Sequence, residues 1–323
     1  FSFVGPKRLH PVPVPLAALG PVDVVVISHD HYDHLDLPTI KALAGTDTLF
    51  AVPLGVGSHL EHWGISSDRV RELDWHEATR IGSLTLTATP ARHFCGRGLR
   101  NTQHTLWASW SVAGPEHRIY HSGDTGYFEG FKDIGAEHGP FDATMIQIGA
   151  YSDFWPDIHM TPEEGMRAHL DLQGGQPHGV MLPIHWATFN LAMHAWSDPG
   201  EGTIAAAHAT GSRIALPRPG EPFEPTAETI PSAPWWREVA RGPPVLRSAL
   251  PGRVACSCRG DSRAPFGFEV LLQHPGGRQV VQPRRPLFAT TPPASASRCD
   301  DTGREPLVPL HEPNCGKVAF QGV

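Results

Sequence analysis

The chain has 323 residues, of which 40% are hydrophobic and 18% charged, a composition typical of a globular protein with one large domain or two. Its formal net charge of −7 offers no positive surface for nucleic acid, so nucleic acid is excluded as an expected partner. No apolar run approaches membrane-spanning length, and the first residues lack the pattern of a signal peptide. These properties predict a cytoplasmic protein.

Short strands and helices alternate along the first half of the chain. The apolar run at residues 22–27 is typical of a buried strand, and residues 38–43 follow as a short helix with Pro38 in the first turn. A helix is then expected from Val56 to Trp63, ending at Gly64. The further strands of this half are expected at residues 48–52, 70–73, 84–89 and 106–112.

The second half continues the alternation. Thr161, Pro162 and Glu164 together predict a helix start, with Thr as the cap, Pro in the first turn and Glu three residues on. The aromatic and aliphatic residues of segment 189–196 could line a lipid groove, but a helix packed on the core is the simpler interpretation. Strands are expected at residues 117–120, 143–148, 180–183 and 213–216, and helices at 127–138 and 204–209.

The composition changes after residue 241 to Pro, Arg, Gly and Ser with scattered cysteines. We therefore expect an ordered domain at residues 1–240 and a largely disordered tail at 241–323, with 266–282 as a candidate hairpin. The cysteines are not expected to form a disulfide framework or a zinc site, because no export signal and no familiar ligand spacing accompany them.

One stretch, residues 28–36, carries three histidines directly behind the first buried strand. His29 and His31 lie two residues apart at the strand end and can hold one metal ion. Asp33 and His34 lie on the following turn and can face a second ion. A His-rich surface loop is the alternative, but the position of the pattern after a buried strand favours two adjacent metal sites.

The pattern His29-x-His31-x-Asp33-His34 resembles the signature of the metallo-β-lactamase-fold hydrolases. The resemblance implies an α/β fold, the four-layer αββα sandwich, here expected to lack its first strands and so to leave a neighbouring strand unpaired. It also implies three further ligands, each after a strand, and the chain offers His93, Asp124 and His185. Carried over, one zinc has the ligands His29, His31 and His93, the other has Asp33, His34 and His185, and Asp124 bridges them.

The short sequence motifs around these ligands, such as His-Tyr-Asp-His-Leu-Asp and Ile-His-Trp-Ala-Thr-Phe, are similar to those of the branch that contains N-acylphosphatidylethanolamine-hydrolysing phospholipase D. That similarity implies a phosphodiesterase in which hydroxide, formed between two zinc ions, attacks the diester. Iron or manganese could replace zinc, since the ligand types suit several metals. Asp33, Asp124 and His159 are the residues expected to act in catalysis, although His159 could instead pack locally.

Two other functions stay open: a lactonase, in which the same hydroxide attacks a carbonyl, and an inactive fragment. The expected substrate is a small molecule or a phospholipid, and a lipid substrate would bring peripheral membrane contact, although no basic amphipathic helix indicates it. Arg97 and Arg100 could contact a phosphate or be exposed loop charges. Asp36 is a candidate for orienting a metal-bound imidazole. The sequence does not indicate an oligomeric state.

Overall fold

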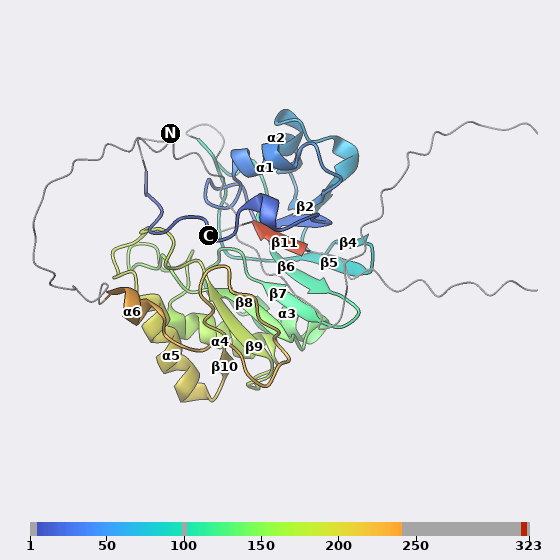
Figure 1. The fold of residues 1–323 in the computed structure, drawn as a ribbon. Helices are drawn as coiled ribbons and strands as arrows, with labels where there is room; N and C mark the ends of the chain where they lie inside the picture. Colours follow the sequence, from blue (N-terminus) through green and yellow to red (C-terminus); the bar gives the residue numbers. More distant parts are fainter. Residues whose placement is uncertain (1–4, 99–101, 241–317, 322–323) are drawn as a thin grey trace, which may run out of the picture.

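A computed structural model describes residues 5–98, 102–240 and 318–321 of the chain. Two β-sheets pack face to face, and helices cover the outer face of each sheet (Figure 1). This arrangement is the four-layer αββα sandwich of the α/β class that the sequence predicted.

The smaller sheet has the strand order β11-β1-β2-β3, and its pairs are parallel. Each of the four residues of β1 is buried, as the apolar run predicted for a strand covered on both faces. The strands are β1 (Val24–Ile27), β2 (Leu49–Pro53), β3 (Val70–Leu73) and β11 (Val318–Gln321).

The larger sheet has the order β10-β9-β8-β7-β6-β5-β4 and is mixed. Its members β7 to β10 pair in parallel, whereas β4 to β7 are joined as antiparallel neighbours. The strands are β4 (Ala78–Ile81), β5 (Leu84–Thr89), β6 (Ser109–Ala113), β7 (Arg118–His121), β8 (Ala143–Gln147), β9 (Val180–Ile184) and β10 (Arg213–Ile214).

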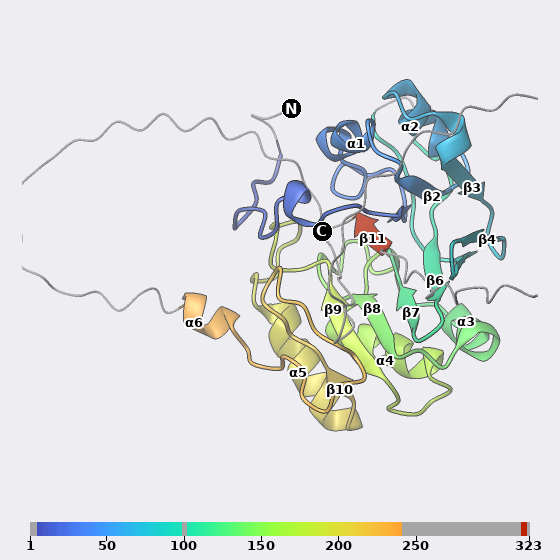
Figure 2. The same cartoon turned by 45° about the vertical axis from the view of Figure 1, so that its right-hand side comes forward.

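Helices cover both sheets, as Figure 2 shows from a second side. The longer helices α4 and α5 pack together over the larger sheet, and α4 begins with the predicted capping box of Thr161 and Glu164. The helices are α1 (Leu37–Leu43), α2 (Gly57–His62), α3 (Gly130–His138), α4 (Pro162–Leu172), α5 (Asp198–Thr210) and α6 (Trp236–Ala240), with 3-10 turns η1 (Leu16–Ala18) and η2 (Ser67–Arg69).

The alternation of side chains in β1 shows how the layers are held. Val24 and Val26 belong to the apolar cluster between the two sheets, while Val25 and Ile27 belong to the cluster that includes residues of α1 and α2. Burial of each such side chain contributes on the order of 2 kcal/mol, so β1 is fixed from both faces. The residues that follow β1 therefore start from a rigid point.

The structure corrects two expectations and adds one strand that was not predicted. Residues 189–196 form turns and bends rather than a helix. β4 was not predicted; it pairs with β5 as the edge of the larger sheet. Residues 318–321, expected to be disordered, form β11, which pairs with β1 from Val24 to Ile27 and covers the edge that was expected to be unpaired.

Several predictions fall on residues that the structure does not describe. These are the candidate hairpin at 266–282, the four cysteines after residue 241, and Arg100. The domain boundary near residue 240 stays a prediction. Within the described ranges, no helix combines the length and the apolar character needed to cross a bilayer.

Candidate metal centre

The predicted ligands meet at one end of the sandwich, because each follows the carboxyl end of a strand. His29, His31, Asp33 and His34 lie between β1 and α1, and His93 follows β5. Asp124 follows β7, and His185 is the first residue after β9. Parallel strands direct their carboxyl ends to the same side of a sheet, which explains why residues so distant in sequence converge.

The structure brings these seven side chains together in two groups. His29, His31 and His93 form one, and Asp33, His34, Asp124 and His185 form the other; within each group the possible ligand atoms lie within 4.8 Å of one another. The first group is the set that the sequence analysis gave to one metal ion, and the second contains the set given to the other ion together with Asp124, the predicted bridge.

The nitrogens of the first group converge on one point. His31 Nδ1 lies 2.8 Å from His29 Nε2 and 3.3 Å from His93 Nε2. Nitrogen ligands of a tetrahedral zinc, each 2.0–2.1 Å from the metal, are about 3.3 Å apart, so the spacing fits a shared cation. The outer nitrogens are fixed by neighbours, since His93 Nδ1 donates to Ile158 O at 3.1 Å and His29 Nδ1 lies 3.0 Å from Ser28 Oγ.

Asp124 lies at the centre of the second group and close to the first. Its Oδ2 is 3.1 Å from His34 Nε2 and 3.2 Å from His185 Nε2, and 3.8 and 3.9 Å from His93 and His29. The first two approaches lack the alignment of a hydrogen bond, and Asp124 Oδ1 also has no partner among the described residues. Buried polar atoms without partners are costly, and a cation would satisfy them. The donor set thus fits two divalent ions with Asp124 between them.

Electrostatics favour the protonation states that bind metal in the first group. Burial, with the neighbouring His34 and His93, holds the pKa of His29 well below its usual value, and burial lowers the pKa of His93 to about 3. Both imidazoles are therefore neutral near pH 7, the form in which histidine ligates a metal.

The second group is charged in the absence of metal. Burial alone would raise the pKa of Asp124, but His185 and His34 outweigh it and hold that pKa well below its usual value. Burial would likewise lower the pKa of His34, yet Asp124 and Asp33 raise it to about 9. A cation at this position would replace the proton of His34 as the partner of the two carboxylates.

A set of contacts that was not predicted braces the ligand loop. The buried Asp30 carboxylate lies 3.3 Å from His59 Nε2 and accepts a hydrogen bond from Gly96 N at 2.6 Å. Arg97 Nη1 donates to the carbonyl oxygens of Asp30 at 2.8 Å and Leu35 at 2.6 Å. Arg97 thus binds the backbone of the ligand loop, which neither of the two interpretations of this residue expected.

Asp36, the candidate for orienting a metal-bound imidazole, caps helix α1. Its carboxylate accepts hydrogen bonds from Thr39 N at 2.9 Å and Thr39 Oγ1 at 2.7 Å, so it caps the first turn of α1. The cap fixes the end of the ligand loop that lies opposite β1.

Unusual backbone conformations lie beside the centre. His185, Ala187 and Ala150 have φ values of 63°, 61° and 59°, which non-glycine residues rarely adopt. Such strain persists only where the surroundings impose it, and it gathers at functional sites. Gly149 permits the closeness of the two loops, since a Cβ there would lie 2.1 Å from His185 O.

The structure also brings His159 to the centre. Its Nε2 lies 3.3 Å from Asp124 Oδ2, and its Nδ1 is 2.9 Å from Ala150 O. A carbonyl oxygen only accepts, so Nδ1 carries a hydrogen, and this contact turns Nε2 toward the site.

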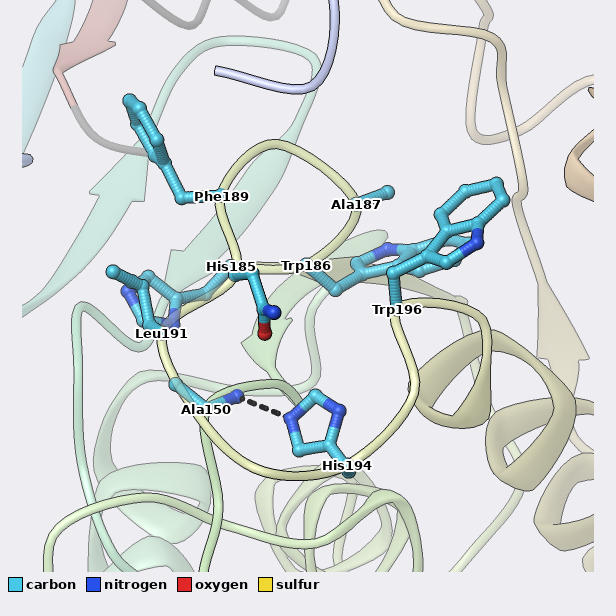
Figure 3. Close-up of a pocket in the computed structure, with 9 residues that line it drawn as sticks. Ala150, His185, Trp186, Ala187, Phe189, Leu191, His194 and Trp196 are labelled. Carbon is cyan, nitrogen blue, oxygen red and sulfur yellow. Dashed lines mark hydrogen bonds between the residues drawn. The ribbon is translucent and has the colours of Figure 1, made fainter. Parts of the chain in front are cut away.

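A small pocket adjoins His185, and Figure 3 shows it. Apolar side chains from the loop after β9 form much of its lining, and Ala150 closes it from the loop after β8. His194, a lining residue that the sequence analysis did not single out, faces Ala150 in this view. The lining residues are Ala150, His185, Trp186, Ala187, Phe189, Asn190, Leu191, His194 and Trp196.

The sandwich and the ligand groups at one end of it are the features of the metallo-β-lactamase fold. Residues 1–186 match the family model described as the β-lactamase superfamily domain. The chain belongs to this superfamily.

Among the relatives compared here, those with a named activity are less similar in sequence than a mycobacterial protein without one. An uncharacterized protein of Mycobacterium tuberculosis is 55% identical over 236 residues, covering 72% of this chain and 62% of that protein. The N-acyl-phosphatidylethanolamine-hydrolyzing phospholipase D 1 of Caenorhabditis elegans is 38% identical, covering 59% of this chain and 56% of that protein. The mitochondrial enzyme of the same name from Saccharomyces cerevisiae is 32% identical over 61% of this chain and 43% of its own length. The chain thus matches less than two thirds of the length of each.

Solved structures agree on the fold. Igni18, a metallo hydrolase from Ignicoccus hospitalis, superposes with a TM-score of 0.52 at 21% identity, covering 65% of this chain and 84% of its own. A possible metal-dependent hydrolase from Veillonella parvula gives 0.52 at 17% identity, covering 68% and 88%. At these identities the likeness supports the sandwich and no particular substrate.

Proposed function

We propose that the protein is a dinuclear metallohydrolase of phospholipase D type, which cleaves N-acylphosphatidylethanolamine or a similar phosphodiester to an acyl-ethanolamine and phosphatidic acid. The observation that carries this proposal is the pair of ligand groups joined at Asp124, with His159 beside them. The substrate class is supported by the two phospholipase relatives at 38% and 32% identity.

The reaction needs a nucleophile and a way to move one proton. Two divalent ions, when bound, make water acidic enough to act as a nucleophile at neutral pH and offset the charge of the diester. In the proposed step the water oxygen bonds to phosphorus, and the bond from phosphorus to the ethanolamine oxygen breaks. When its Nε2 carries no proton, His159 can accept the proton of the attacking water there and return it to the leaving oxygen.

Asp33 and Asp124 have an electrostatic part in this scheme. His34 is the first of the neighbouring groups that lower the pKa of Asp33 against the opposing effect of burial, and both carboxylates are therefore ionised. As anions they hold cations in place and limit the net positive charge that the substrate meets. Zinc is the proposed metal, and iron or manganese suit the same ligand types.

The apolar pocket beside His185 supports an apolar substrate group. Its lining includes Trp186, Phe189, Leu191 and Trp196, so an apolar group that lies against these side chains would be partly removed from water.

Hydrolysis in labelled water tests the proposal. Protein loaded with zinc is mixed with N-acylphosphatidylethanolamine in detergent micelles in ¹⁸O-water, and the products are analysed by mass spectrometry. The proposal predicts equal amounts of acyl-ethanolamine and phosphatidic acid, with the label in the phosphatidic acid. Asp124→Asn should abolish turnover, whereas Asp133→Asn on the exposed face of α3 should leave it unchanged. Turnover of lactones without cleavage of the diester would replace the proposal with a lactonase.

We further propose peripheral contact with a lipid surface. Tyr32, Phe154 and Met193 are 61%, 86% and 87% exposed, and they lie on the ligand loop, the loop before His159 and the loop after His185. Large apolar side chains at such exposure are costly in water and can enter a membrane interface.

Replacement of Phe154 and Met193 by Ser together should lower binding to zwitterionic vesicles at least tenfold, measured by sedimentation. Hydrolysis of a short-chain, water-soluble diester should not change. Unchanged vesicle binding would contradict the proposed contact.

A further inference from the structure

His194 lies outside the ligand set and was not singled out in the sequence, yet it contacts the backbone that holds His159. Ala150 N donates a hydrogen bond to His194 Nε2 at 3.0 Å, the interaction drawn as a dashed line in Figure 3. The ring of Tyr151 stacks on His194 with the centroids 4.4 Å apart and the planes at 21°. His194 is therefore fixed on two sides by the loop after β8.

The contact defines the tautomer of His194. A backbone N–H only donates, so Nε2 of His194 is the acceptor and carries no hydrogen. The other ring nitrogen, Nδ1, lies 3.0 Å from Ala195 O, a carbonyl that only accepts, so Nδ1 carries the hydrogen. The neutral ring thus satisfies one donor and one acceptor of the backbone at the same time.

Ala150 connects His194 to His159. The carbonyl oxygen of Ala150 accepts hydrogen bonds from Trp155 Nε1 at 2.8 Å and from His159 Nδ1 at 2.9 Å. The residue is buried and has a φ of 59°, a conformation that alanine adopts rarely. His194 on the amide side and Trp155 and His159 on the carbonyl side are the contacts that hold it there.

We propose that His194 is a positioning residue: by accepting the amide hydrogen of Ala150 it orients the Ala150 carbonyl, which keeps a hydrogen of His159 on Nδ1 and turns Nε2 toward Asp124. The catalytic consequence rests on the proposed function, since it assumes that His159 Nε2 handles the proton of the hydrolysis. The positional consequence does not, because it concerns the tautomer of a ring in the resting protein.

The tautomer of His159 is the first readout and needs no substrate. Zinc-loaded protein with ¹⁵N-labelled histidine is examined by NMR, and the His159 resonances are assigned by their loss in His159→Gln. In the native protein Nδ1 should show the shift of a protonated nitrogen and Nε2 that of an unprotonated one. In His194→Ala the two shifts should move toward each other as the ring exchanges between tautomers. Unchanged His159 shifts in a folded His194→Ala protein would overturn the proposal.

The second readout is rescue by a conservative variant. The amide oxygen of glutamine in His194→Gln can occupy the position of Nε2 and accept from Ala150 N, so this variant should retain the native His159 shifts and most of the activity. His194→Ala should lower kcat about tenfold with KM within a factor of two, as expected when one oriented hydrogen bond is lost. His208→Ala, exposed on α5, is the matched control. Should His194→Ala fail to fold, His194→Gln decides: altered His159 shifts or lost activity there would contradict the proposal.

A double-mutant comparison separates this inference from the function on which it rests. In a His159→Gln background, His194→Ala should add no further loss of kcat, because its effect passes through His159. Equal losses in both backgrounds would show that His194 acts by another route. If the protein does not hydrolyse phosphodiesters at all, the proposed function fails, while the shifts of His159 still decide whether His194 sets its tautomer.

Discussion

At the scale of single residues, the centre depends on charged side chains that are not themselves proposed ligands. Asp30, 1% exposed, is paired with His59 and Gly96, and Arg97 binds the carbonyl oxygens on both sides of the ligand turn. The guanidinium carbon lies 4.2 Å from the ring centre of Tyr32 and 5.1 Å from that of Trp63. The loop is therefore shaped before any metal arrives, which reduces the entropy lost on binding.

Arg97→Lys tests this bracing. The planar guanidinium of arginine lies over two aromatic rings and binds two carbonyl oxygens at the same time. The compact ammonium of lysine cannot do both, so the ligand turn should loosen. We expect zinc affinity, measured by competition with a chelator, to fall about tenfold, the lower end of the effect of losing a group that supports metal ligands. Arg80→Lys on β4, which is exposed, is the control, and equal affinities for the two variants would contradict the bracing.

The difference between ligands and bracing residues explains what the sequence could predict. The ligands lie in short patterns after strands, so local spacing was enough to find His29, His31, Asp33 and His34. His59 and Arg97 act on Asp30 across separations of 29 and 67 residues, and nothing in their own neighbourhoods marks them. His194 was missed for the same reason, since its partner Ala150 lies 44 residues away.

At the scale of elements, strands that deliver ligands were predicted well and segments that depend on distant partners were not. β3 and β5 match their predicted residues, because buried apolar runs and alternating patterns are local signals. The segment after His185 has aromatic spacing compatible with a helix, but Ala187 is left-handed and Thr188 O accepts from Leu9 N across the molecule. Tertiary contacts therefore determine its course, and β11, which pairs with β1 from the far end of the chain, is a similar case.

Helix α4 carries a pH-dependent contribution to stability. His169 is fully buried, with Nδ1 2.7 Å from Thr144 Oγ1 of β8, and burial lowers its pKa to about 4 from the usual 6.5. Below pH 6.5 the unfolded chain binds a proton that the folded chain does not, so this group makes stability rise with pH between about 4 and 6.5.

His169→Gln should remove this contribution. The free energy of unfolding is measured with urea at pH 5 and pH 7 for both chelator-treated proteins. From pH 5 to pH 7 it should rise by about 2 kcal/mol more in the native protein than in the variant. His208→Gln, exposed on α5, serves as the comparison and should follow the native protein. A variant that rises as steeply as the native protein would contradict a neutral His169 in the fold.

At the scale of the whole molecule, the apolar cluster between the two sheets supports the strands from which the ligand loops emerge. The apolar cluster between the sheets includes Val26 of β1, Trp110 of β6 and Leu182 of β9, so strands from both sheets are held in fixed register below the centre. The metal site is therefore built on rigid elements, while the pocket and the exposed apolar residues lie on loops. Such a division lets one sandwich keep its metal chemistry as loops change the substrate.

The measurement that tests the account most directly is the metal content of the purified protein, determined by elemental analysis together with protein concentration. The two ligand groups predict about two transition-metal ions per chain. Asp124→Asn, which weakens the group shared by both sites, should hold fewer ions, whereas Asp133→Asn should hold the native number. A folded native protein that holds no transition metal would contradict the dinuclear centre. So would an Asp124→Asn protein that keeps both ions and loses them to a chelator no faster than the native protein does.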